Sequence, residues 1–100
     1  MAKVSATTTL VAHEGRFDEL LDVVEKMVAA AREEDGTELY VVHRATRVPN
    51  TLFLFELFRD KDALKAHAAA GGPIGELLSP LVAESTVVLG EPVAGTGLAL

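Results

Sequence analysis

The stretch that most constrains the fold is LFLFELF, residues 52–58, in which every residue except Glu56 is apolar. Successive side chains of a β-strand point to opposite faces of the sheet, so a strand with one solvated face alternates apolar and polar residues. Because this stretch does not alternate, it predicts a strand that is covered on both faces. One layer of helices covers only one face, so the other face needs a separate cover.

The segments around this stretch predict a small α+β domain. Apolar residues recur at steps of three and four from Phe17 to Ala31, which predicts a helix, and Gly36 is expected to stop it in a left-handed conformation. Residues 48–50 are short enough to join two neighbouring strands as an antiparallel hairpin. From their β-branched and aromatic residues, strands are expected at 4–12, 38–47, 51–59 and 83–89.

A second helical region is expected between the hairpin and the last strand. Asp60 can cap a helix that runs through Ala69. Gly71 and Gly72 interrupt this helix, and Pro73 can begin a further piece. The apolar side of that piece consists of Leu77, Leu78 and Leu81. The order β-α-β-β-α-β predicts a ferredoxin-like sandwich, a four-stranded antiparallel sheet with helices on one face.

The open face of this sheet predicts a homodimer. A second copy of the same sheet, packed face to face by two-fold symmetry, is the simplest cover for the apolar strand, and it closes an α+β barrel. The alternative is a monomer whose own tail folds across the sheet. With 100 residues the chain has the length of a single domain, 1–100, in which residues 91–100 are a C-terminal tail or dimer arm.

Composition excludes several classes of function. A net charge of −6, without a basic cluster, disfavours nucleic acid as a partner. No apolar run is long enough to span a membrane and no export signal is visible, so a soluble cytoplasmic protein is expected. The absence of cysteine removes thiolate chemistry, and the spacing of the three histidines matches no metal signature. The acidic run 33–35 is interpreted as a solvated helix end.

Two residues are candidates for chemistry. His67 follows Ala63 and Leu64 by four and three residues, so it shares the helix face that points at the sheet, and histidine is suited to moving protons near neutral pH. A histidine satisfied by a backbone carbonyl is the alternative. Glu56 is costly to bury without a partner. A hairpin centred near Pro49 places Val42 opposite Glu56 and Arg44 on the diagonal, so Arg44 is expected to pair with Glu56, either in a site or as a structural ion pair.

Side-chain alternation divides the hairpin into two sets. One set consists of Tyr40, Val42, Arg44, Leu54, Glu56 and Phe58. The other consists of Leu39, Val41, His43, Phe53, Phe55 and Leu57. If the first set faces the helices, which we favour, His67 meets its polar members in a pocket typical of small-molecule sites. If the second set faces them, His67 meets His43 and Glu56 belongs to the dimer contact.

The segment FLFELFRDKDALKAH, preceded by ELYVV and a short hairpin, resembles the antibiotic biosynthesis monooxygenase (ABM) domain. The matching positions are Glu56, Phe58, Asp60 and His67. The resemblance implies a dimeric ferredoxin-like barrel. Its members include cofactor-free oxygenases of quinols and anthrone-like polyphenols, haem-degrading oxygenases and an isomerase of a phosphorylated sugar. The haem-degrading branch is the least similar, because this chain has no tryptophan, no asparagine in its first strand and no histidine after His67.

This resemblance implies a cofactor-independent monooxygenase that oxidises a small aromatic or polyphenolic substrate with dioxygen and needs no metal. His67 would act as base or hydrogen-bond partner, Arg44 and Tyr40 would stabilise the substrate anion, and Glu56 would orient one of them. The substrate-binding walls would come from Phe58, Leu54, Val42, Leu64, Phe53 and His43. A non-catalytic dimer that binds a small ligand, or an isomerase on the same fold, is the alternative.

Overall fold

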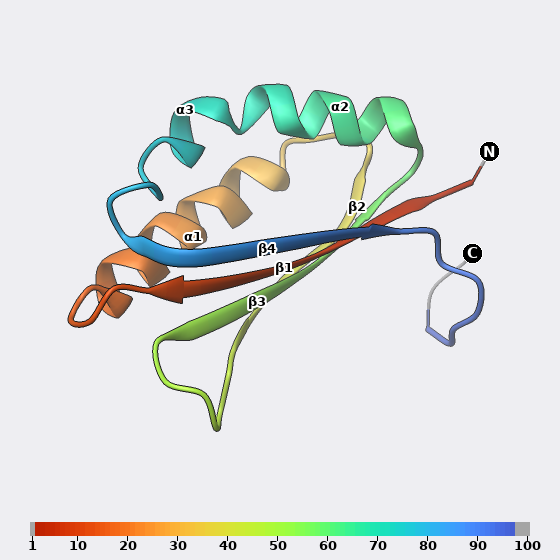
Figure 1. The fold of residues 1–100 in the computed structure, drawn as a ribbon. Helices are drawn as coiled ribbons and strands as arrows, with labels where there is room; N and C mark the ends of the chain where they lie inside the picture. The colour runs from red at the N-terminus through yellow and green to blue at the C-terminus, as the bar shows by residue number, and fades with distance from the viewer. Residues whose placement is uncertain (1, 98–100) are drawn as a thin grey trace.

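The computed structural model describes residues 2–97 as a four-stranded antiparallel sheet with three helices on one face (Figure 1). The strands are β1 (Val4–Ala12), β2 (Thr37–Arg44), β3 (Thr51–Phe58) and β4 (Val82–Gly90), and the helices are α1 (Phe17–Ala31), α2 (Lys61–Ala70) and α3 (Gly72–Gly75). The strand order β2-β3-β1-β4 is that of the ferredoxin-like sandwich, which confirms the predicted fold class. Within residues 2–97, no helix is long and apolar enough to cross a membrane.

The set of hairpin side chains that contains Tyr40 and Glu56 faces the helices, as we favoured. The rings of Tyr40 and Phe58 both lie against His67 of α2. On the neighbouring strand β1 the same face carries Ala6, Thr8 and Leu10, because Ala6 pairs with Glu56 and Thr8 with Leu54. The central strands β3 and β1 therefore form the floor beneath the helices.

The hairpin register differs from the prediction by two residues. Tyr40, and not Val42, lies opposite Glu56, and Arg44 lies opposite Leu52. The cause is the connection, because β2 ends at Arg44 and the loop begins at Ala45, three residues earlier than expected. Asn50 closes this loop in the left-handed region with φ 58°, which asparagine tolerates better than most residues. The shift keeps the faces unchanged but moves Arg44 away from Glu56.

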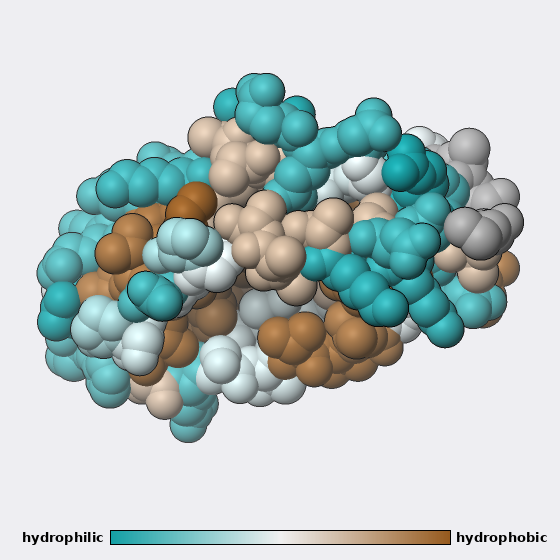
Figure 2. Space-filling view, turned by 90° about the horizontal axis from the view of Figure 1, so that it is seen from above, coloured by the Kyte–Doolittle hydropathy of each residue, from teal (hydrophilic) through white to brown (hydrophobic). Residues whose placement is uncertain are grey.

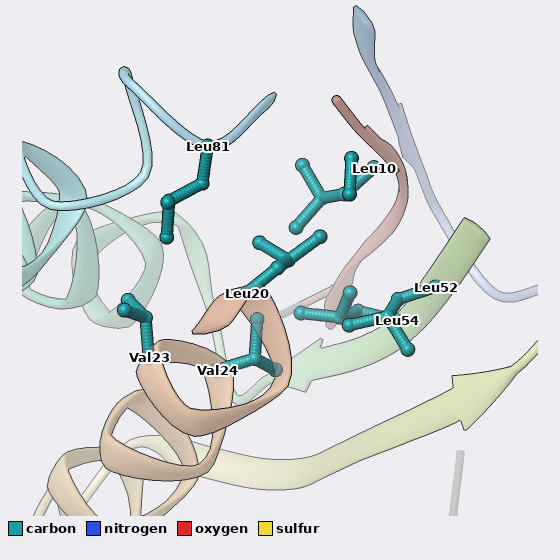
Figure 3. Close-up of a cluster of buried hydrophobic side chains, with 8 residues drawn as sticks. Leu10, Leu20, Val23, Val24, Leu52, Leu54 and Leu81 are labelled. Atoms are coloured by element: carbon teal, nitrogen blue, oxygen red, sulfur yellow. The ribbon is translucent and has the colours of Figure 1, made fainter. Parts of the chain in front are cut away.

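The core lies between α1 and the central strands (Figure 3). Leu20 and Val24 of α1 are fully buried against Leu52 and Leu54 of β3, so the predicted apolar helix face is confirmed. Leu81, in the connection before β4, closes the cluster. In the α3 region the prediction was partly wrong, because that helix is only one turn long and Leu77 is exposed.

Gly36 has a different role from the predicted left-handed stop. The C-cap of α1 is Arg32 in a right-handed conformation, and Gly36 is not among the residues with positive φ. A Cβ atom at Gly36 would collide with Cβ of Ala63 in α2. The Gly36 carbonyl also accepts a hydrogen bond from the N–H of Arg59 at 2.9 Å. Glycine therefore allows the α1–β2 connection to lie directly against α2.

The opposite face of the sheet carries the second set of hairpin side chains. His43 stacks on Phe53 with ring centroids 4.6 Å apart, and Phe55 is 46 % exposed. The chain after β4 turns to this side (Figure 1). Pro92, Ala94 and Gly95 line an open cavity of about 230 Å³ together with residues of the sheet. Residues 98–100 of the expected tail lie outside the described part of the chain.

Apolar surface also remains along β4. Val87 and Leu89 pair with Thr8 and Ala6, so they point to the helix side, yet they remain exposed because the helices do not reach this edge. Figure 2, a view from the helix side, shows apolar surface next to a helix layer of mixed polar and apolar residues. Since Val88 is exposed on the other face as well, β4 is an apolar edge strand on both sides.

Candidate functional site

Helix α2 brings His67 over strand β3. The carboxylate of Asp60 accepts a hydrogen bond from the N–H of Ala63 at 2.8 Å, so the predicted cap is confirmed. Ala63 is buried and Leu64 is partly buried next to Phe58, which fixes the helix face that meets the sheet. His67 is the next residue on this face, one turn further along. Its position follows from the cap and the packing of α2.

The imidazole of His67 is held between two carboxylates. Its Nδ1 is 2.7 Å from Oε1 of Glu34, and its Nε2 is 3.2 Å from Oε1 of Glu56. Ionised carboxylates only accept hydrogen bonds, so a ring that donates to both of them is an imidazolium, and this arrangement favours that protonation state. The hydrogen bond with Glu56 raises the pKa of His67; burial opposes this, and the bond with Glu34 adds to it.

Glu56 is the fixed member of this cluster. Its side chain is only 9 % exposed on the central strand β3, and its Oε2 accepts a hydrogen bond from the hydroxyl of Thr8 at 3.1 Å. The expectation that Glu56 needs a partner is therefore confirmed, but the predicted partner Arg44 was wrong. Thr8 was missed, although a polar residue between Ala6 and Leu10 on the buried face of β1 is a visible signal.

Glu34 was also missed. It follows α1, and its Oε1 accepts a second hydrogen bond from the hydroxyl of Thr37 at 2.7 Å. Its side chain is 19 % exposed, while Glu33 and Asp35 on either side are exposed, so the interpretation of the whole acidic run as solvated was wrong for Glu34. No local pattern distinguishes it from its neighbours, because the turn between α1 and β2 sets its direction.

Two aromatic rings form the walls around His67. The Phe58 ring, which is fully buried, lies 5.0 Å from the imidazole, and the Tyr40 ring lies 5.7 Å away, between centroids. The hydroxyl of Tyr40 is buried without a hydrogen-bond partner among residues 2–97. Burial, followed by the charges of Glu56 and Glu34, raises the pKa of Tyr40. The hydroxyl therefore stays protonated and can donate.

The other predicted site residues lie elsewhere. Arg44 is exposed at the far end of β2, where its guanidinium carbon is 5.3 Å from the centroid of the Phe17 ring. His43 and Phe53 lie on the open face, away from His67. Val42 and Leu54 share the face of His67 but pack into the core under α1. Only Leu64 of the predicted wall joins Phe58 beside the histidine.

The cluster is not arranged for a metal ion. Its carboxylates lie against different nitrogens of His67, so they do not converge on one point. In the described part of the chain, no group of three or more His, Cys, Asp or Glu side chains could hold a metal ion.

The fold and the cluster define a ferredoxin-like α+β protein with a partly buried histidine between acidic side chains. The chain belongs to the antibiotic biosynthesis monooxygenase family, whose model matches residues 3–72. This match extends from β1 to the start of α3, so it includes His67, Glu34 and Glu56. No curated protein sequence is similar enough to count as a match.

Solved structures agree with this fold. The chain is similar to Rv0793 from Mycobacterium tuberculosis, with a TM-score of 0.88, 19 % identity and coverage of 96 % of this chain and 100 % of that one. It is also similar to PA3566 from Pseudomonas aeruginosa, with a TM-score of 0.86, 20 % identity and coverage of 94 % of this chain and 97 % of that one. A third similar structure is a candidate antibiotic biosynthesis monooxygenase from Caulobacter crescentus CB15. The TM-score is 0.86 and the identity 21 %, and the match covers 93 % of this chain and 92 % of that one. At these identities the likeness establishes the fold alone.

Proposed function

We propose that this protein is a monooxygenase that oxidises a small, electron-rich aromatic compound with dioxygen and uses neither metal nor flavin. Family membership supports the class of reaction. The observation that carries the proposal is the position of the His67 imidazole. It lies between two carboxylates, 5.7 Å from the Tyr40 ring, between centroids, and beside the Phe58 ring. A cation and a free hydroxyl donor between aromatic walls suit a phenolate anion.

The chemistry can be written for an anthrone, whose enol is a phenol. Loss of the O–H proton leaves an anion that donates one electron to dioxygen. The resulting radical and superoxide combine to a peroxide anion, which takes up a proton and becomes a hydroperoxide. Loss of water from the hydroperoxide forms a carbonyl group, so one oxygen atom enters the product and the other leaves as water. Dioxygen accepts all four electrons that the substrate loses, and no further reductant is needed. The protein must therefore remove a proton and stabilise an anion in a site with little water.

Each residue of the candidate site has a distinct role in the proposed reaction. A charged His67 suits the role of hydrogen-bond donor better than that of base, and it can donate to the substrate anion where that anion replaces one of the two carboxylates at its nitrogens. The Tyr40 hydroxyl offers a second donor. Glu56 keeps His67 charged and in place from the rigid strand β3. Phe58 and Leu64 supply the apolar wall.

We further propose that the protein acts as a homodimer through the open face of the sheet. Phe55 and Val88 are exposed there, and the apolar side chains of β4 extend this surface around its edge. The buried Nε2 of His43 has no hydrogen-bond partner among residues 2–97, and a second subunit could supply one. A second subunit on the open face would also provide the cover that the apolar pattern of β3 requires.

Oxygen consumption with a panel of anthrones and hydroquinones tests the proposed reaction. We expect the wild type to consume one molecule of dioxygen per molecule of anthrone oxidised, and His67→Ala to lose most of this activity. His13→Ala is the control, because His13 is exposed in the loop before α1. Equal rates for wild type and His67→Ala would remove His67 from the mechanism. Thermal stabilisation by the panel without oxygen consumption would instead favour a ligand-binding protein.

A further inference from the structure

We propose that Glu34 takes the proton of the substrate, and that its carboxylate occupies, in the resting protein, the place that the substrate anion takes against His67. This inference rests on the proposed oxidation of a phenolic compound. It concerns a residue in the connection between α1 and β2, outside the strand and the helix that carry Glu56 and His67.

The two carboxylates beside His67 are held differently. Glu56 lies on the central strand, is 9 % exposed, and uses both oxygens, one with His67 and one with Thr8. Glu34 is 19 % exposed and lies on a connection. Both of its hydrogen bonds, with His67 and Thr37, use Oε1. Its Oε2 therefore remains to accept a proton, and its position gives it a route to solvent. Glu34 is the member that can move and exchange protons.

The position of Glu34 is that of an anion on an imidazolium. Its Oε1 lies 2.7 Å from Nδ1 of His67, a distance typical of a charge-assisted hydrogen bond. A phenolate oxygen has the same charge and the same capacity to accept. When a phenol enters, its O–H bond can break with the proton passing to Glu34, while the phenolate oxygen accepts the N–H of His67. Protonated Glu34 then loses its attraction to the cation and releases the proton to water.

A cavity lies beside Tyr40 of the candidate site. It has a volume of about 210 Å³ and lies between the end of α1 and strand β2. Its lining includes Arg32, Thr37 and Tyr40, but neither Glu34 nor His67. A ligand in this cavity would lie against Tyr40 and against Thr37, whose hydroxyl donates to Glu34.

Binding of 4-nitrophenolate, followed by its visible absorption, tests the position without any turnover. Glu34→Ala removes the competing carboxylate, and we expect it to bind the probe about tenfold more tightly than the wild type. Glu33→Ala is the matched control, because Glu33 is the exposed neighbour, and it should bind like the wild type. Equal or weaker binding by Glu34→Ala would overturn the proposed position.

Turnover tests the proton transfer. Glu34→Gln keeps an acceptor for His67 but cannot take a proton, so we expect its kcat to fall about 100-fold with little change in KM. Glu34→Asp should recover part of the rate, and Glu33→Gln should keep the wild-type rate. A wild-type kcat in Glu34→Gln would exclude Glu34 as proton acceptor. If the wild type oxidises none of the compounds, the proposed function fails, and the nitrophenolate experiment alone decides whether Glu34 holds an anion position.

Discussion

His67 and Glu56 face each other across the two layers of the protein, with Nε2 of His67 3.2 Å from Oε1 of Glu56. This contact joins α2 to the central strand and keeps the imidazole next to the rings of Tyr40 and Phe58. Opposite charges that are both largely buried stabilise a fold less than their Coulomb attraction suggests, but removing one partner leaves the other unpaired. Replacing one member of the pair should therefore lower stability more than replacing both by apolar residues.

Glu56→Leu should lower the free energy of unfolding by about 3 kcal/mol, because it leaves Nε2 of His67 and the Thr8 hydroxyl without their acceptor. The double variant Glu56→Leu, His67→Leu should be more stable than the sum of the single effects predicts. Urea denaturation of the four proteins measures both quantities. Additive effects would indicate that the two side chains do not interact.

The stability of the protein should depend on pH through His67. The pKa of His67 is raised in the folded state, so the folded chain binds this proton more tightly than the unfolded chain. The stabilisation is complete below the unfolded value, about 6.5, and is lost as pH rises through the raised folded pKa. Thermal unfolding between pH 6 and pH 9 should show this loss for the wild type and for His13→Gln, and a smaller one for His67→Gln. Parallel profiles for the wild type and His67→Gln would contradict it.

Tyr40→Phe should lower activity without lowering stability. The hydroxyl of Tyr40 is buried without a partner in the described structure, so its removal should leave stability unchanged or slightly increased. If this hydroxyl stabilises the substrate anion, kcat should fall about 100-fold. Thermal unfolding and oxygen consumption on the same sample measure the two effects. A normal kcat would exclude the hydroxyl from the reaction.

Gly36→Ala should destabilise the fold by about 1–3 kcal/mol, because the added methyl group meets Cβ of Ala63. It should also disturb the contact between Glu34 and His67, since Gly36 and Glu34 share one connection. Gly72→Ala is a suitable control, because open space surrounds that position and alanine restricts the unfolded chain. Chemical denaturation compares the two, and equal stabilities would show that the connection can move aside.

Phe55→Lys should convert the proposed dimer to a monomer by placing a charge in its apolar interface. Leu77→Lys provides the matched control, because Leu77 is 47 % exposed and Phe55 46 %, but Leu77 lies on the connection between α3 and β4. Sedimentation at micromolar concentration should show a dimer for the wild type and for Leu77→Lys. A monomeric wild type would refute the proposed assembly.

The order of elements was predictable because it depends on local patterns. The apolar stripe of α1, the Asp60 cap and the β-branched strand 4–12 each determine their own segment. The hairpin register was not predictable in this way, because it depends on where the loop from Ala45 to Asn50 turns. Nothing in the composition of the loop marks that point. A shift of two residues leaves each side chain on the same face of the sheet. The face of Glu56 was therefore predicted correctly, but its partner was not.

The candidate site was predictable only where it follows from periodicity. His67 and Glu56 each break the apolar pattern of a buried face, so each stands out in the sequence. Glu34 lies in an acidic run and reaches the histidine only because the α1–β2 connection, which includes Gly36, packs against α2. Contacts of this kind are set by tertiary packing.

The protonation state of His67 tests the central claim most directly. Nitrogen-15 NMR of histidine-labelled protein at pH 7.5 distinguishes an imidazolium, with both ring nitrogens protonated, from a neutral ring, with one. We predict that His67 shows two protonated nitrogens at this pH, and that Glu56→Gln lowers the pH at which it loses one. A neutral His67 ring in the wild type at pH 7.5 would contradict the account.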